Sequence, residues 1–181
     1  AALAAALRGP GGNRTMRSIS VGGNPGSDTD AARALAGCAA ANFLRGAGTG
    51  EALRSVSDRG LGDTGAAEVA AYLRSEPSTA FLLTAVGFQH NGMGPRGCEA
   101  LAEALGTLPA LVELAMYSNS VGASGAASLA RCVVATSRTL QVLDLGGNSV
   151  GDEGCKALAA AIRGRLSLVE LHLDHNGIGG E

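Results

Sequence analysis

Three short motifs in the chain have residue types and spacings that could do chemistry. Residues 60–65 read GLGDTG and residues 92–97 read GMGPRG. Both match G-x-G-x-x-G, which cradles a dinucleotide pyrophosphate when it joins a strand to a helix. Residues 147–151 read GNSVG and match G-x-S-x-G, the turn that presents the nucleophilic serine of many hydrolases. Taken alone, these motifs would predict nucleotide binding or acyl transfer.

Four residues near the carboxyl end have side chains that can bind a metal ion: Glu170, His172, Asp174 and His175. Residues two apart on one strand are about 6.6 Å apart at the backbone, so one ion could be reached by two of them. No cysteine joins the group, and His175 shares its place before an asparagine with His90. We therefore predict no metal site and no cofactor.

The chain repeats one pattern every 28 or 29 residues, and this repeat changes the meaning of the motifs. The clearest copy spans residues 139–162, where Leu140, Leu143 and Leu145 precede Asn148. The equivalent residues of three other copies are Leu83, Val86, Phe88 and Asn91; Leu111, Leu114, Met116 and Asn119; and Leu168, Leu171, Leu173 and Asn176. Self-similarity at such a period indicates a solenoid.

In this register the motifs lose their catalytic appearance. The stretches equivalent to GMGPRG read SVGASG at residues 120–125 and SVGDEG at residues 149–154. The last two glycines thus recur in these four stretches, whereas the position of Ser149 also holds glycine. We interpret the motifs as a repeated turn in which the asparagine amide bonds to buried backbone, and we predict no catalytic residue.

Each copy predicts a short strand, a turn and a helix, and one copy alone buries too little apolar surface to fold. Stacked copies share parallel strands spaced about 4.8 Å apart and helices spaced about 8–10 Å apart. The stack must therefore curve, with its sheet on the concave side.

The pattern LxxLxLxxNxVGxxGxxxLxxxI at residues 140–162 resembles the ribonuclease-inhibitor-like subclass of leucine-rich repeats. That subclass includes the repeat regions of NOD-like receptors, ribonuclease inhibitor and the Ran GTPase-activating proteins. The resemblance implies an α/β leucine-rich-repeat solenoid, a horseshoe with parallel strands on the concave side and helices on the convex side. It also implies that the horseshoe binds other proteins.

We expect a single leucine-rich-repeat domain over residues 1–181, with five to six repeats, and we expect it to be a piece of a longer protein. The predicted units are the tail of a preceding repeat (1–15), five repeats (16–50, 51–80, 81–108, 109–137 and 138–165) and a truncated repeat (166–181). The first repeat has a predicted helix from about Asp28 to Leu44. The second is the least regular, because GAGTG is inserted at 46–50 and Arg59 replaces the asparagine.

Composition excludes several classes of protein. The formal net charge of -2 argues against nucleic-acid binding, which requires clustered Lys or Arg. No apolar run approaches the ~18 residues of a membrane span. Cys98 and Cys155 hold small-residue positions two repeats apart, and Cys38 and Cys132 belong to distant repeats. We therefore expect four reduced thiols and a cytoplasmic, intracellular location.

Alternate residues of a strand point to opposite faces, so the concave face can be read from the sequence. Its predicted partner-binding residues are Glu113, Tyr117, Asp144, Glu170, His172 and Asp174. This carboxyl half is acidic, whereas the amino half is small and neutral. One interpretation is a site for a basic segment with Tyr117 as an aromatic anchor; the other is a merely solvated sheet face.

Three functional hypotheses follow. The first is a non-catalytic scaffold, not an enzyme, that binds another protein on its concave face. The second is a GTPase activator of the Ran-directed type whose partner is a small GTPase, although no catalytic residue can be transferred to this sequence. The third is the sensor repeats of a NOD-like receptor.

Overall fold

The computed structural model describes residues 53–75, 83–163 and 167–179, together with residues 30, 32–34, 36, 37 and 40. Those seven earlier residues are helical, as predicted for the first repeat. The expected tail at 1–15, the expected first strand, the GAGTG insertion and Cys38 lie outside the described residues.

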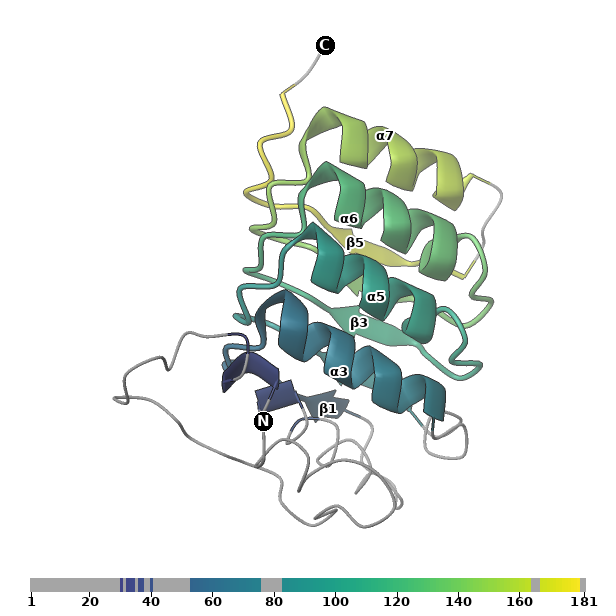
Figure 1. Ribbon diagram of the computed structural model, residues 1–181. Coiled ribbons are helices and arrows are strands. Elements are labelled where there is room, and N and C mark those ends of the chain that lie inside the picture. The colour runs from purple at the N-terminus through teal and green to yellow at the C-terminus, as the bar shows by residue number, and fades with distance from the viewer. Residues whose placement is uncertain are drawn as a thin grey trace.

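The described strands form one parallel sheet in chain order. They are β1 (Leu53–Ser55), β2 (Ala85–Gly87), β3 (Glu113–Ala115), β4 (Val142–Asp144) and β5 (Glu170–His172). The helices α3 (Gly62–Ser75), α5 (Pro95–Leu105), α6 (Gly122–Leu129) and α7 (Gly151–Ile162) stack in the same order and cover one face of the sheet (Figure 1). Strand, turn and helix therefore alternate as the sequence pattern predicts, and the solenoid is confirmed.

The core lies between the sheet and the helix layer. The central strand residues Val86, Leu114 and Leu143 are fully buried, and they face each other across the sheet in register. Leu129 and Leu158 cover them from the helices and are also fully buried. Each such side chain contributes about 1.5–3 kcal/mol by its removal from water. Stacked repeats therefore gain a burial free energy that a single repeat lacks.

Adjacent helices approach closely where glycine recurs. A Cβ atom on Gly97 would lie 2.7 Å from the Cα atom of Asp63 in the preceding helix, a distance that real side chains do not tolerate. Glycine at this repeated position therefore sets the helix spacing.

Four buried asparagines follow the strands and form what we call the asparagine ladder: Asn91, Asn119, Asn148 and Asn176. The side-chain amide of Asn148 donates to the Leu145 carbonyl of its own repeat (3.0 Å) and to the Met116 carbonyl of the preceding repeat (2.9 Å). Its backbone N–H donates to Asn176 Oδ1 at 3.0 Å. Each asparagine thus satisfies buried backbone in its own turn and in the turn before it, as predicted.

Arg59 shows what the loss of one ladder residue does. The N–H groups of Arg59 and Leu61 donate to Asn91 Oδ1 at 3.0 and 3.4 Å, so the asparagine of the next repeat still satisfies this turn. The hydrogen bonds from the following repeat are therefore kept although Arg59 stands where the other repeats have asparagine. Consequently β1 stays paired in register with β2.

The turns before the helices are of two kinds. Gly122 and Gly151 have φ values of +65° and +61°, and their N–H groups donate to the carbonyls of Asn148 and Asn176. Gly94 is instead extended, with φ −88° and ψ −172°, because the following Pro95 disfavours helical geometry at the residue before it.

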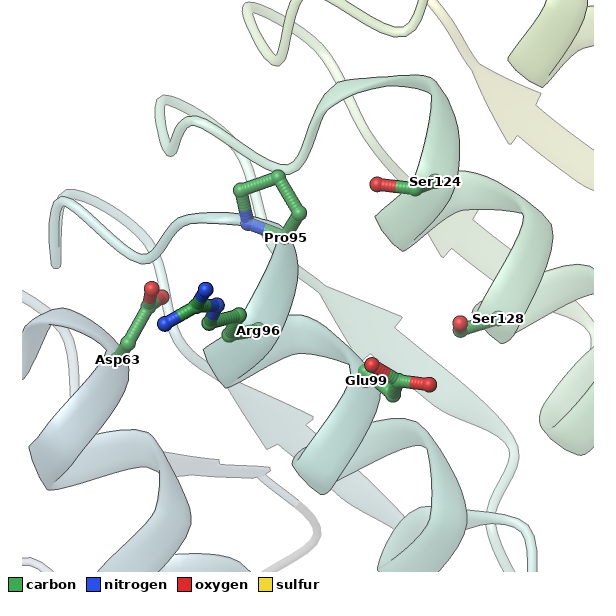
Figure 2. A pocket seen from close by; sticks show the side chains of 6 residues that line it. All are labelled: Asp63, Pro95, Arg96, Glu99, Ser124 and Ser128. Carbon is green, nitrogen blue, oxygen red and sulfur yellow. The ribbon is translucent and has the colours of Figure 1, made fainter.

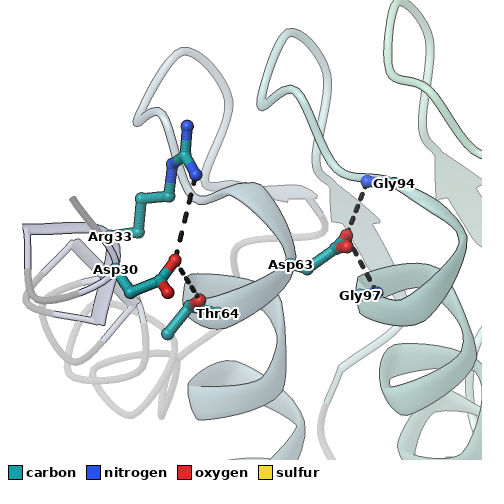
Figure 3. A network of polar contacts seen from close by, with 6 residues as sticks. All are labelled: Asp30, Arg33, Asp63, Thr64, Gly94 and Gly97. Carbon is teal, nitrogen blue, oxygen red and sulfur yellow. Dashed lines mark hydrogen bonds and ion pairs between the residues drawn. The ribbon is translucent and has the colours of Figure 1, made fainter. Parts of the chain in front are cut away.

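A carboxylate of the preceding repeat compensates at the extended turn. Asp63 Oδ1 accepts the N–H groups of Gly94 (2.6 Å) and Gly97 (3.0 Å) (Figure 3). Asp152 accepts the Gly179 N–H in the same way, at 3.0 Å. An acidic residue near the start of one helix therefore holds the next turn.

A further link joins the earliest described helix to α3. Asp30 Oδ1 accepts the Thr64 hydroxyl at 3.0 Å and lies 3.9 Å from Arg33 Nη1 (Figure 3). The first repeat is thus attached to the second through polar side chains on the helix side.

One repeat is a residue longer than its neighbours, and its helix absorbs the difference. α6 continues directly into η1 (Ala130–Val134), a π-helical segment, and a π turn accommodates one extra residue in a helix. The central strand residues Leu114 and Leu143 are accordingly 29 positions apart, against 28 between Leu143 and Leu171. The strands consequently remain in register.

Candidate functional site

The concave face carries the six predicted residues on three adjacent strands and the turns that follow them. Ala115, Asp144 and His172 are direct neighbours across β3, β4 and β5, and Glu113 and Glu170 flank Val142 in the same way. Neighbouring strands lie about 4.8 Å apart, so Asp144 and His172 are adjacent at the backbone. Glu113 and Glu170 are about 10 Å apart.

Tyr117 is held between two repeats. Its ring makes an edge-to-face contact with His90, with centroids 5.5 Å apart and planes at 77°. On the other side it lies against Gly146, where an added Cβ atom would be 2.7 Å from Tyr117 Cδ2. The side chain is 37% exposed. The ring is therefore an accessible aromatic surface in a fixed position.

The acidic side chains differ in how firmly they are held. Asp144 is half-buried, and its Oδ1 accepts the Gly146 N–H at 2.9 Å, which fixes the carboxylate beside the glycine that supports Tyr117. Glu170 and His172 are exposed and lie 3.4 Å apart between Oε2 and Nε2. Asp174 is exposed at the following turn.

The amino half of this face has a different chemistry. Ser57 donates a short hydrogen bond to Gln89 Oε1, and its hydroxyl also accepts the Gln89 N–H at 3.1 Å. Ser55 and Ser57 are 2.8 Å apart between their hydroxyl oxygens. These neutral groups bond largely to one another, so the charge of the described concave face lies in its carboxyl half.

Sequence reasoning missed the supports of Tyr117. His90 was interpreted as a strand-end residue equivalent to His175, and Gly146 was given no role. The signal was present, because Gly146 and Asp174 occupy the position of Tyr117 in later repeats. A glycine next to an aromatic on the neighbouring strand leaves room for the ring.

The possible metal ligands and the cysteines were the other candidates for chemistry. Among the described residues, no three of His, Cys, Asp and Glu are placed to hold a metal ion. Cys98, Cys132 and Cys155 are free thiols. Burial, followed by the charges of Asp63 and Glu99, raises the pKa of Cys98 to about 12, so this thiol stays protonated at neutral pH.

None of the described helices combines the length and apolarity needed to cross a bilayer.

A family model described as "Leucine Rich repeat" matches residues 81–102, 136–159 and 166–181. Ribonuclease inhibitor of Sus scrofa is 39% identical over 69 residues, which are 38% of this chain and 15% of that protein. Ribonuclease inhibitor of Mus musculus is 30% identical over 99 residues, 55% of this chain and 22% of that protein. Human NACHT, LRR and PYD domains-containing protein 12 is 35% identical over 81 residues, 45% of this chain and 8% of that protein.

With the repeats and the asparagine ladder in place, these matches identify a leucine-rich-repeat protein of the ribonuclease-inhibitor-like subclass. The chain spans less than a quarter of the length of each of these relatives.

Two solved structures share the fold. The tropomodulin C-terminal domain of Caenorhabditis elegans superposes with a TM-score of 0.61 and 14% identity, over 74% of this chain and 80% of that one. A structure titled "Leiomodin-1 Actin-Binding Site 2 (ABS2)" gives 0.62 and 12%, over 74% and 76%. At such low identity the likeness concerns the fold alone.

Proposed function

We propose that the chain is a non-catalytic scaffold that binds a basic segment of another protein on the acidic half of its concave face. We define this acidic half as the six residues Glu113, Tyr117, Asp144, Glu170, His172 and Asp174. The observation that supports it best is Tyr117, an exposed aromatic ring fixed between His90 and Gly146 beside the Asp144 carboxylate.

Physical reasoning favours binding over mere solvation of this face. The strands are fixed in register, so the partner meets a preorganised surface and little conformational entropy is lost on binding. Aromatic residues dominate the binding energy of many interfaces. The flanking carboxylates select a positively charged partner and speed its association.

Site-specific cross-linking tests which face is used. p-Benzoylphenylalanine replaces Tyr117 in one variant and the exposed Ala159 of α7 in a matched control. We expect the variant at 117, and not the one at 159, to cross-link to a discrete partner that mass spectrometry identifies. Equal cross-linking from both positions would argue against a concave site.

Charge reversal tests the acidic character of the site. The double variant Asp144→Arg with Glu170→Arg should fold normally and lose that partner. The control Glu103→Arg with Glu153→Arg makes the same charge change on the helix side and should retain the partner. Unchanged capture by the first variant would mean that the acidic half is only solvated surface.

The similarity to the human NACHT, LRR and PYD domains-containing protein favours a second candidate, repeats that act as the sensor of a larger receptor. The sequence that precedes Ala1 in the full-length protein tests it, because a nucleotide-binding domain should be found there. The GTPase-activator hypothesis is tested by GTP hydrolysis with a panel of small GTPases, and no stimulation of any of them would remove it.

A further inference from the structure

A hollow of about 490 Å³ lies on the convex side, away from the proposed concave site. It is lined by Asp63, Pro95, Arg96, Glu99, Ser124 and Ser128 (Figure 2). This volume falls in the range of about 300–1,000 Å³ that ligand pockets occupy. The hollow is therefore large enough to receive a long side chain.

The hollow exists because α6 presents short side chains where its neighbours present long ones. Its first exposed residues are Ala123, Ser124 and Ala127. The equivalent residues of α7 include Glu153 and Lys156, which are exposed and ion-paired at 2.8 Å. The exposed side chains of α6 next to α5 are consequently short and uncharged.

Ser128 points to a ligand in this hollow. Its side chain lines the hollow, only 8% of the residue is exposed, and its hydroxyl makes no hydrogen bond to any residue that the structure describes. Its Oγ atom keeps contact with the hollow, since it is not among the fully buried polar atoms without a partner, so water bonds to it there. A polar group of a bound molecule would take the place of that water.

The charge around Ser128 favours a cation. Glu99 is exposed, has no ion pair within the described part of the chain, and extends from α5 toward α6 (Figure 2). After burial, the charges of Asp63 and Glu99 are the further causes that raise the pKa of Cys98 beneath them, which is the effect of a negative local field. The guanidinium of Arg96 extends the other way, toward Asp63 (Figure 2).

We propose that the groove between α5 and α6 binds an arginine side chain of a partner protein, held by the Glu99 carboxylate and the hydroxyls of Ser124 and Ser128. A guanidinium has five N–H donors in a planar fork, so it can bond a carboxylate with two of them and reach a hydroxyl with another. A lysine ammonium is a compact point charge and matches this spread of acceptors less well. The convex side thus offers a second interaction surface, independent of the concave one.

Titration of the whole 181-residue chain with N-acetyl-arginine amide, followed by ¹H–¹⁵N NMR, tests the proposal. We expect shifts centred on Ser124, Ser128 and Glu99. N-acetyl-citrulline amide has nearly the same shape without the charge and should bind roughly tenfold more weakly, since charge-assisted bonds are the stronger ones. Equal binding of the citrulline probe, or the absence of shifts at Ser124, Ser128 and Glu99, would overturn the proposal.

Three variants complete the test. Glu99→Gln and Ser128→Ala should each weaken the arginine probe at least several-fold while the spectrum stays that of the folded protein. Asp58→Asn makes the same charge change at an exposed position of the turn after β1 and should leave the response unchanged. If Glu99→Gln binds as the unaltered chain does, the groove is not the site; if N-acetyl-lysine amide binds as tightly as the arginine probe, the assignment to arginine is wrong.

Discussion

The asparagine ladder and the acidic half of the concave face stand on the same strands and follow opposite rules. Every ladder position after β2 holds the same residue, fully engaged with buried backbone. Positions on the concave face change from repeat to repeat, as Ala115, Asp144 and His172 show within one row. The difference teaches that identity between repeats marks what the fold requires, whereas variation between repeats marks where a partner can be selected.

The sharpest test of this difference compares two adjacent residues of β4. Leu143→Asp places a charge in the fully buried core and should lower the free energy of unfolding by more than about 4 kcal/mol. Asp144→Asn keeps the Oδ1 acceptor of Gly146 and should change it by less than about 0.5 kcal/mol. Urea denaturation measures both, and an unaltered melt of Leu143→Asp would refute the register.

The buried thiol of Cys98 predicts a loss of stability at high pH. Its pKa is raised from 9.0 to about 12 by burial and then by Asp63 and Glu99. Below pH 9 the thiol is protonated in both states and its contribution is complete. Between pH 9 and pH 12 only the unfolded state ionises, so up to about 4 kcal/mol is lost as pH rises.

The control for that measurement is Cys98→Ala, since Ala126 occupies the equivalent position of the next repeat. The variant should lose less stability over this pH interval than the unaltered chain. Parallel pH profiles of the two proteins in urea denaturation would contradict the assignment of the effect to Cys98.

Removing one residue of the ladder should cost less than a core charge and more than any concave substitution. Asn148→Ala removes one of the two side-chain donors of the Met116 and Leu145 carbonyls, which Asn119 and Asn176 still serve. It also removes the Oδ1 acceptor of the buried Val121 N–H, and we expect a cost of about 1–3 kcal/mol. Thermal and urea melts measure it. Ser120→Ala, at an exposed position of the preceding turn, should change the free energy of unfolding by less than about 0.5 kcal/mol. A loss as large as that of Asn148→Ala would show that the asparagine ladder contributes no more to stability than other turn residues.

Gly146→Ala should have the smallest effect on stability and a specific effect on the site. Gly146 is not one of the described glycines with a positive φ. Alanine therefore fits the backbone there, at a cost below about 1 kcal/mol. The new methyl carbon would lie 2.7 Å from Tyr117 Cδ2, which is too close, so the ring would move. Loss of the nuclear Overhauser effects between His90 and Tyr117 is expected, and their persistence would show that the ring is not held by this contact.

The sequence was sufficient for the parts of the fold that depend on repeated residues. Leucine spacing gave the strands and the core, and Leu143 and Asn148 lie where the repeat predicts. This succeeds because burial and backbone hydrogen bonding impose the same demand on each repeat, so one copy confirms another.

Features peculiar to one repeat could not be predicted in this way. The π segment at 130–134 and the carboxylate bonds of Asp63 depend on the three-dimensional fit between neighbouring helices. Pro95 did contain the signal for the extended turn at Gly94. The partner-binding role of the concave residues stays a prediction, because an exposed side chain is selected by a molecule outside the chain.

The asparagine ladder also gives the solenoid a direction. Each asparagine bonds backward: Asn176 accepts the N–H groups of Asn148 and Val150 and donates to Leu145, all in the repeat before it. Cutting away a later repeat therefore strips donors and acceptors from the turn that becomes terminal, whereas cutting away an earlier one leaves the next turn satisfied. Such a stack should unzip from its carboxyl end, with amide hydrogen exchange fastest there and slowing toward the middle repeats.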